Sequence, residues 1–320
     1  MSSSAMSDSS IVICECFARD GLQHETVAVT TAQKIKLIDT FTAVGFPRIE
    51  ATSYSHPGRI PMFADASEVL AGISRKAGVW YKATCPNAKA VDRAVADLDA
   101  GHGANELSLL ISATEAHTER NLRTTRAGQW QRVEEMVAGA GSRFRLVGVI
   151  SVALGCPFEG DVDPDVVAAD VRRFVDLGVG IVAIGDTTGL ATPRRVRALF
   201  ERLRREAPQA TLVAHFHNTR GSGLANAVAA YEAGCRYFDT SFGGVGGHPV
   251  TIQYGQGRTG NVATEDLVNL FESEGVSTGL DLDRMMQSSK LCEDILGRPL
   301  DSMVARAGLG PVRTKGKVDA

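Results

Sequence analysis

Two histidines separated by one residue follow a short apolar segment, and they are the first candidates for chemistry. His215 and His217 come directly after residues 212–214, which are typical of a buried strand. Side chains alternate between the two faces of a strand, so both imidazoles point the same way. Two imidazoles at the carboxyl end of a strand can bind a metal ion, whereas the alternative is one structural histidine beside a chance neighbour. Oxygen ligands at other strand ends favour the metal.

Acidic and basic residues end the first two predicted strands. Asp20 offers a carboxylate oxygen to a metal ion, and Arg19 is a fixed positive charge that can hold a developing enolate or carboxylate. A surface Arg–Asp turn is the alternative for this pair. Glu50 stands inside an otherwise apolar strand, where an unpaired charge is costly to bury. Pairing with an arginine or a catalytic role would explain it.

Polar residues also end three later segments. Ser112, which follows the fourth predicted strand, is a candidate substrate-binding residue, and Asp186 ends the sixth strand after a Val-Ala-Ile run. We expect Asp186 to transfer a proton or to support other site residues, with a helix cap as the alternative. Near residue 260, Asn261 can add an amide oxygen to the metal site. Alternatively, Asn261 or Thr264 caps the following helix.

A glycine-rich loop at residues 243–249 follows the eighth predicted strand. Such a loop can lie close over a ligand and move as a lid. His248 is its one titratable side chain.

The candidate metal ligands can now be taken together. With Asp20, His215 and His217, Asn261 would complete a mixed nitrogen and oxygen ligand set. That set suits Mg²⁺ or Mn²⁺, and Zn²⁺ stays open.

The elements that must position these residues alternate between strands and helices. Eight strands are predicted, at residues 11–16, 48–53, 79–84, 106–111, 144–152, 181–186, 212–217 and 237–241. Helices are predicted between them, for example at residues 31–44, 88–100, 164–177 and 193–206. This order predicts an α/β protein with a (β/α)8 TIM barrel, in which the chemistry sits at the carboxyl ends of the strands. A doubly wound sheet is disfavoured because no glycine-rich phosphate turn follows the first strand.

The pattern also divides the chain. We expect a disordered lead at residues 1–10 and the barrel at residues 11–275. Carboxyl-terminal helices at residues 276–307 should pack on the barrel, followed by a flexible tail at residues 308–320.

Composition narrows the classes of function. The 320 residues carry a net charge of -3 without a basic block, which disfavours nucleic-acid binding. No apolar run approaches the ~18 residues of a membrane span. The six cysteines form no CxxC pair, and five lie in or beside apolar segments. This usage indicates reduced thiols in a cytoplasmic enzyme.

Several segments in register resemble the 3-hydroxy-3-methylglutaryl-CoA (HMG-CoA) lyase family, over roughly residues 11–296. The strongest match is Glu-Cys-Phe-Ala-Arg-Asp-Gly-Leu-Gln at residues 15–23; others lie at residues 49–53, 154–160, 185–189, 215–217 and 260–266. The resemblance implies a divalent cation on Asp20, His215, His217 and Asn261. It also implies catalytic or substrate-binding roles for Arg19, Gln23, Glu50, Asp186 and Glu265.

Three positions depart from the family and bear on the substrate. The family has a catalytic cysteine directly before a proline in the glycine-rich loop, and here that position is His248. Asn218 replaces an acid of the family's His-x-His-Asp-Thr segment, and Arg220 takes a position that is often aromatic. Arg220 either meets an extra substrate carboxylate or is simply exposed.

The function implied is retro-Claisen cleavage of a 3-hydroxyacyl-CoA thioester. Asp186, with Glu50 nearby, would take the hydroxyl proton, and Arg19 would hold the enolate charge. His248, with an unperturbed pKa of ~6.5, would protonate the enolate carbon. Alternatives are a lyase for a relative such as citramalyl-CoA, a Claisen synthase running in reverse, and a non-catalytic metal-binding relative. The resemblance also suggests a homodimer.

Overall fold

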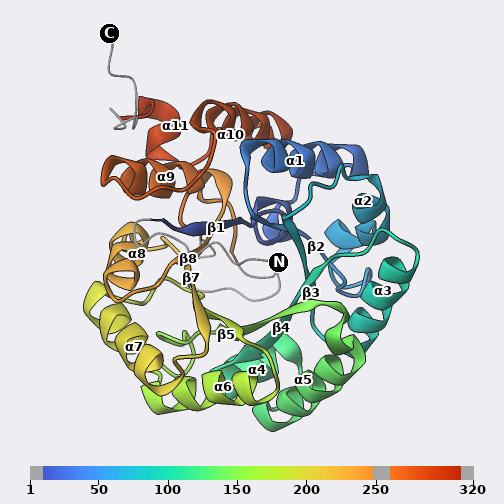
Figure 1. The fold of residues 1–320 in the computed structure, drawn as a ribbon, viewed down its shortest axis with the longest axis vertical. Coiled ribbons are helices and arrows are strands. Elements are labelled where there is room, and N and C mark those ends of the chain that lie inside the picture. The colour runs from blue at the N-terminus through green and yellow to red at the C-terminus, as the bar shows by residue number, and fades with distance from the viewer. Residues whose placement is uncertain (1–9, 248–259, 311–320) are drawn as a thin grey trace.

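The strands close a barrel. The structure is a computed structural model that describes residues 10–247 and 260–310. Each strand pairs in parallel with the next, and β8 pairs with β1, so that the sheet has no edge (Figure 1). The strands are β1 (Val12–Glu15), β2 (Arg48–Ser53), β3 (Trp80–Cys85), β4 (Glu106–Ser112), β5 (Arg145–Ser151), β6 (Ile181–Asp186), β7 (Thr211–Phe216) and β8 (Tyr237–Thr240). The predicted TIM barrel is confirmed.

Helices surround the barrel as an outer ring (Figure 1). They are α1 (Thr31–Val44), α2 (Ala66–Gly72), α3 (Ala88–Asp99), α4 (Glu115–Leu122), α5 (Arg126–Ala140), α6 (Pro164–Asp176), α7 (Pro193–Glu206), α8 (Gly223–Glu232) and α9 (Thr264–Ser273). The carboxyl-terminal extension adds α10 (Leu282–Leu296), which packs on α1, and α11 (Met303–Ala307), which packs on α9. In the described part of the chain, none of these helices combines the length and apolar character that crossing a membrane requires.

Local signals explain why several predicted bounds are correct. Helix α1 begins after Thr30, whose side chain accepts a hydrogen bond from the Gln33 N–H in a capping box. It ends at Gly45, where φ is 104°, a left-handed conformation that glycine adopts without steric cost. Helix α7 begins with Pro193, which needs no N–H partner at that position. The preceding Thr192 takes the N-cap position, although its side chain makes no capping hydrogen bond.

The apolar core and the barrel interior differ in chemistry. The main core lies between the strands and the helices, where residues such as Leu107, Ile184 and Phe200 are fully buried. Inside the barrel, a second apolar cluster has only three buried members, which are Val147, Ala183 and Val213. Charged side chains that are buried there include Arg48, Lys82, Glu106 and Asp239. The barrel interior therefore contains a network of buried charged side chains rather than a packed apolar core.

Several sequence-based expectations fall on residues that the structure does not describe. These are most of the disordered lead (residues 1–9), most of the flexible tail (residues 311–320) and part of the glycine-rich loop (residues 248–259), which includes His248.

Candidate active site

Three predicted metal ligands converge at one end of the barrel. Asp20 lies in η1 (Phe17–Gly21), a single π-type turn after β1, whereas His215 is on β7 and His217 follows it. A carboxylate oxygen and one ring nitrogen from each histidine all lie within 4.8 Å of one another. The expected juxtaposition of residues about 195 positions apart in the sequence is therefore present, and it follows from the parallel closure of the barrel.

Asn261 lies beside this group. It forms an isolated bridge with His217, and its Nδ2 atom donates hydrogen bonds to Asp20 Oδ2 at 2.7 Å and to the Val245 carbonyl at 3.1 Å. These two bonds fix the amide orientation and leave its Oδ1 atom buried without a hydrogen-bond partner. A Cβ atom on Gly246 would stand 2.0 Å from Asn261 Nδ2, so only glycine lets the loop pass this closely.

The donor set fits a divalent cation. One carboxylate, two imidazoles and an unpartnered amide oxygen form a mixed nitrogen and oxygen set of the kind that binds Mg²⁺ or Mn²⁺. Burial alone would raise the pKa of the Asp20 carboxyl, but Arg19 and the two histidines hold that pKa below its usual range. Asp20 is therefore ionised, as a ligand must be.

Arg19 is held between two acids. Its Nη1 atom lies 2.9 Å from Asp20 Oδ1 and its Nη2 atom 2.6 Å from Glu50 Oε1. Glu50 is fully buried and also accepts a hydrogen bond from Thr84 Oγ1 at 2.8 Å. Arg19 is thus an arginine partner for Glu50, one of the two explanations that the sequence offered. Its guanidinium also lies next to Asp20, one of the candidate metal ligands.

Sequence reasoning missed two charged residues beneath the ligands. Asp239 pairs in register with His215 across β7 and β8, and its Oδ2 atom lies 3.3 Å from His215 Nδ1. The Nζ atom of Lys82 lies 3.7 Å from Asp239 Oδ2 and 3.6 Å from Glu50 Oε1, so it links the two acids. Both residues are charges inside largely apolar strands, the same signal that singled out Glu50.

Asp186 ends β6, as expected, and its carboxylate orients the loop that follows. It accepts hydrogen bonds from the N–H groups of Leu190 at 2.8 Å and Ala191 at 3.1 Å. Burial raises the pKa of Asp186, while these two N–H donors oppose the rise. These contacts hold the loop before α7 and do not cap that helix, whose N-cap position is Thr192, so the helix-cap alternative is wrong. Each oxygen still has a lone pair to accept a substrate proton.

The predicted substrate-binding residues have different surroundings. Gln23 lines a cavity of about 600 Å³ beside the β1–α1 loop. Arg220 is exposed and donates through Nη1 to the carbonyls of Thr188 and Gly189, so it braces the loop after β6. Ser112 is buried, and its hydroxyl lies 2.7 Å from His117 Nδ1. Of these three residues, Ser112 and Arg220 both have hydrogen-bond partners within the protein.

The start of α9 differs from expectation in its cap, and Glu265 has contacts that the sequence did not predict. Glu265 is fully buried, accepts a hydrogen bond from the Gly243 N–H at 2.9 Å and contacts the Ser289 hydroxyl, so it connects the glycine-rich loop to α10. Neither Asn261 nor Thr264 caps α9, because Ala263 holds that position without a side-chain bond. The Thr264 hydroxyl instead contacts Glu15 and Thr240. Burial of polar side chains against distant elements explains both differences.

Comparison with known proteins relates this geometry to a family. The HMGL-like family model matches residues 10–292. The mitochondrial hydroxymethylglutaryl-CoA lyase of Macaca fascicularis is 37% identical over 298 residues, which are 93% of this chain and 89% of that protein. A 3-hydroxy-3-isohexenylglutaryl-CoA/hydroxymethylglutaryl-CoA lyase of Pseudomonas aeruginosa is 36% identical over 296 residues, covering 92% and 96%.

Solved structures give the same relationship. An HMG-CoA lyase of A. baumannii, in complex with coenzyme A and 3-methylmalate, has a TM-score of 0.89 and 38% identity over 98% of this chain and 99% of that one. A hydroxymethylglutaryl-CoA lyase from Pseudomonas aeruginosa has a TM-score of 0.87 and 35% identity, over 93% and 97% of the two chains.

Proposed function

Because this chain belongs to the HMGL-like family, we infer that it is a hydroxymethylglutaryl-CoA lyase-type enzyme, a carbon–carbon lyase that cleaves a 3-hydroxyacyl-CoA thioester to an acyl-CoA and a keto acid. The observation that carries the inference is the convergence of Asp20, His215, His217 and Asn261 beside the Arg19–Glu50 pair. A bound cation and a fixed positive charge next to it both stabilise the negative charge that develops in a reaction through an enolate.

The residues that would hold the cation are Asp20, His215, His217 and Asn261, and Mg²⁺ or Mn²⁺ suits them best. When bound, a divalent cation lowers the pKa of a coordinated hydroxyl group and stabilises negative charge on a neighbouring oxygen. Asp239 would support this set by accepting a hydrogen bond from His215 Nδ1, which leaves Nε2 free to face the cation.

The remaining steps fall to other side chains. Asp186 takes the proton of the substrate's 3-hydroxyl group, because burial raises its pKa and two N–H donors hold its orientation. Cleavage of the adjacent C–C bond leaves negative charge on the thioester oxygen, and Arg19, held by Glu50, stabilises it. His248 then protonates the enolate carbon. It lies outside the described residues, and its proposed role rests on its position before a proline in the glycine-rich loop, where the family has a catalytic cysteine.

A substrate panel tests the proposal. The purified protein with Mg²⁺ or Mn²⁺ is given HMG-CoA, an HMG-CoA analogue with a longer 3-substituent, and citramalyl-CoA, and acyl-CoA release is followed by chromatography. We expect divalent-ion-dependent cleavage of at least one thioester. The reverse incubation with acetyl-CoA and keto acids distinguishes a synthase. Normal Mn²⁺ binding without turnover of any thioester would instead indicate a non-catalytic relative.

The proposed small-molecule partner is an acyl-CoA substrate, as in the similar structure that holds coenzyme A. A homodimer and a cytoplasmic location remain proposals from the family resemblance and the cysteine usage. Light scattering on the eluted protein tests the first, and a fluorescent fusion observed in the source cell tests the second.

A further inference from the structure

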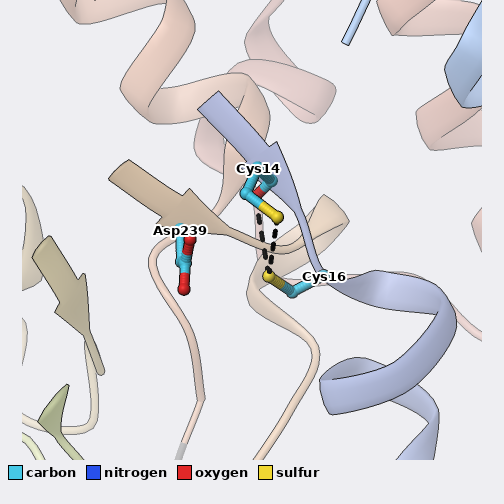
Figure 2. A group of neighbouring side chains, drawn as sticks. All are labelled: Cys14, Cys16 and Asp239. Carbon is cyan, nitrogen blue, oxygen red and sulfur yellow. Dashed lines mark hydrogen bonds between the residues drawn. The ribbon is translucent and has the colours of Figure 1, made fainter. Parts of the chain in front are cut away.

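A second group of possible metal ligands lies inside the barrel below the proposed active site. It consists of Cys14 on β1, Cys16 directly after β1 and Asp239 on β8, and each residue offers a ligand atom within 4.8 Å of the others (Figure 2). The two cysteines are two residues apart in the sequence, and both are fully buried. Neither takes part in the chemistry proposed above.

These two cysteines differ from the other four. Cys85, Cys156, Cys235 and Cys292 belong to the apolar core between strands and helices, where a thiol packs as a small hydrophobic group. Cys14 and Cys16 belong to neither apolar cluster. Cys14 pairs in register with both Arg48 and Asp239 on the neighbouring strands. Cys14 and Cys16 are therefore surrounded by charged side chains, and apolar packing does not explain why thiols occupy these positions.

The sulfur geometry fits one tetrahedral ion. The two Sγ atoms lie 3.9 Å apart, and Figure 2 shows the Cys14 and Cys16 side chains next to each other with Asp239 on the adjacent strand. Two thiolates bound to one zinc ion at about 2.3 Å in a tetrahedron stand about 3.8 Å apart. The pair therefore already has the spacing of one edge of a zinc or cadmium site.

Asp239 has an oxygen to contribute. Its Oδ2 atom faces His215 Nδ1 at 3.3 Å, whereas its Oδ1 atom is buried and accepts no hydrogen bond. The nearest ion-pair partner of Oδ1 is Arg48 Nη1, at 3.7 Å. An unpartnered buried carboxylate oxygen is costly unless a ligand satisfies it. Asp239 can thus accept a hydrogen bond from His215 with Oδ2 and bind a metal ion beside the two thiols with Oδ1.

The surrounding charges allow the thiols to ionise when a cation binds. Two thiolates and one carboxylate carry three negative charges, and a divalent cation leaves one. Lys82 and Arg48 both lie 3.7 Å from an oxygen of Asp239. Each also forms an ion pair with a second acid, Lys82 with Glu50 and Arg48 with Glu106. Binding releases one proton from each thiol to solvent.

We propose that Cys14, Cys16 and Asp239 form a second, thiophilic metal site that takes Zn²⁺ or Cd²⁺, separate from the Mg²⁺ or Mn²⁺ site above it. Soft thiolate ligands select these ions over Mg²⁺ and Mn²⁺, so the two sites differ in the ions that they prefer.

Cadmium titration of the full-length protein, saturated with Mn²⁺, tests this site. A Cd²⁺–thiolate bond gives an ultraviolet charge-transfer band that the sulfur-free upper site cannot produce. We expect the band to saturate at one Cd²⁺ per chain and to disappear when Zn²⁺ displaces the cadmium. X-ray absorption at the cadmium edge should show two sulfur neighbours in the wild-type protein. No band, or a cadmium shell without sulfur, would overturn the proposal without any need for a variant.

Variants locate the site. Cys14→Ser and Cys16→Ser should each weaken Cd²⁺ binding by about 100-fold or more and reduce the band, while Mn²⁺ binding and the melting temperature show that the fold is intact. Cys85→Ser and Cys235→Ser are matched controls, because they remove equally buried thiols from the apolar core. A band that survives both site substitutions, or that is lost in a core control, would place the cadmium elsewhere. None of these measurements depends on turnover.

Discussion

The Nδ1 atom of His215 lies 3.3 Å from the Oδ2 atom of Asp239, its register partner on the neighbouring strand. A carboxylate in this position fixes the tautomer of a metal-binding histidine and raises its basicity as a ligand. The relationship joins the candidate cation site to the charged interior of the barrel, because Asp239 also lies 3.7 Å from both Lys82 and Arg48.

Asp239→Asn should therefore weaken Mn²⁺ binding by about 10- to 100-fold, because the amide keeps the shape of the side chain but not its charge. Electron paramagnetic resonance of free Mn²⁺ measures the Kd directly. Asp170→Asn is the control, since it removes a carboxylate from an ion pair with Arg126. Equal Mn²⁺ affinities in the two variants would show that Asp239 does not support His215.

Asp20→Ala or His215→Ala should abolish Mn²⁺ binding and thioester cleavage together, since each removes one of the converging ligands. Calorimetry and the cleavage assay follow the two losses. Glu159→Ala, which removes an acid whose carboxylate contacts the Ala116 N–H in an exposed region, should affect neither. Turnover retained in Asp20→Ala would refute the ligand assignment.

Asp186→Asn should lower kcat by about 100- to 10,000-fold with little change in KM or Mn²⁺ affinity, because a carboxamide cannot accept the hydroxyl proton. The amide oxygen can accept only one of the two N–H bonds from Leu190 and Ala191, so the melting temperature is measured as well. A kcat within tenfold of the wild-type value would assign Asp186 to loop positioning alone.

His248→Ala should lower kcat far more than it changes Mn²⁺ affinity, because the imidazole is the expected proton donor and not a metal ligand. Single-turnover kinetics and the Mn²⁺ Kd separate the two effects. His248→Cys, which restores the residue type of the family, should recover part of the rate. An unaffected kcat in His248→Ala would exclude the histidine as the acid.

Glu15 should make the protein less stable at high pH. Burial raises the pKa of Glu15 to about 8, in spite of hydrogen bonds from Thr264 and from two backbone N–H groups. The Thr264 hydroxyl contacts both Glu15 and Thr240, and its single hydrogen serves both contacts only if Glu15 carries a proton. The folded protein therefore keeps a proton that the unfolded chain releases near pH 4.5.

Since the unfolded state binds fewer protons over this range, the free energy of unfolding should fall as pH rises from about 4.5 to 8, by up to about 5 kcal/mol from this group. Glu15→Gln, which keeps the shape and can donate to Thr264, should remove that slope and gain stability relative to the wild type above pH 8. Urea unfolding at several pH values measures both curves. Parallel curves would mean that Glu15 is ionised in the folded protein.

The sequence alone determined the barrel and the convergence of the candidate ligands Asp20, His215 and His217. Periodicity and caps are local, so α1, β2, β6 and α7 have the predicted bounds. The ligands were predictable for a related reason. In a parallel barrel, all strands end at the same rim, so polar residues at strand ends must meet wherever they lie in the chain.

The tertiary structure decided which protein groups satisfy the buried polar side chains. Glu265 contacts Gly243 and Ser289, and Ser112 contacts His117, and none of these contacts was predicted from the sequence. Local sequence cannot distinguish these outcomes, because the partner that satisfies a buried polar atom comes from a distant element.

The barrel interior was the largest omission from the sequence analysis. Lys82 and Asp239 stand out only as charges inside largely apolar strands, and nothing in the sequence pairs them with each other or with Cys14 and Cys16. Closure of the sheet brings these residues together. A charge can be buried in an apolar strand when an opposite charge lies a few ångströms away. Whether such an opposite charge is near depends on the tertiary structure. The position of each strand and of its end, in contrast, follows from the local sequence.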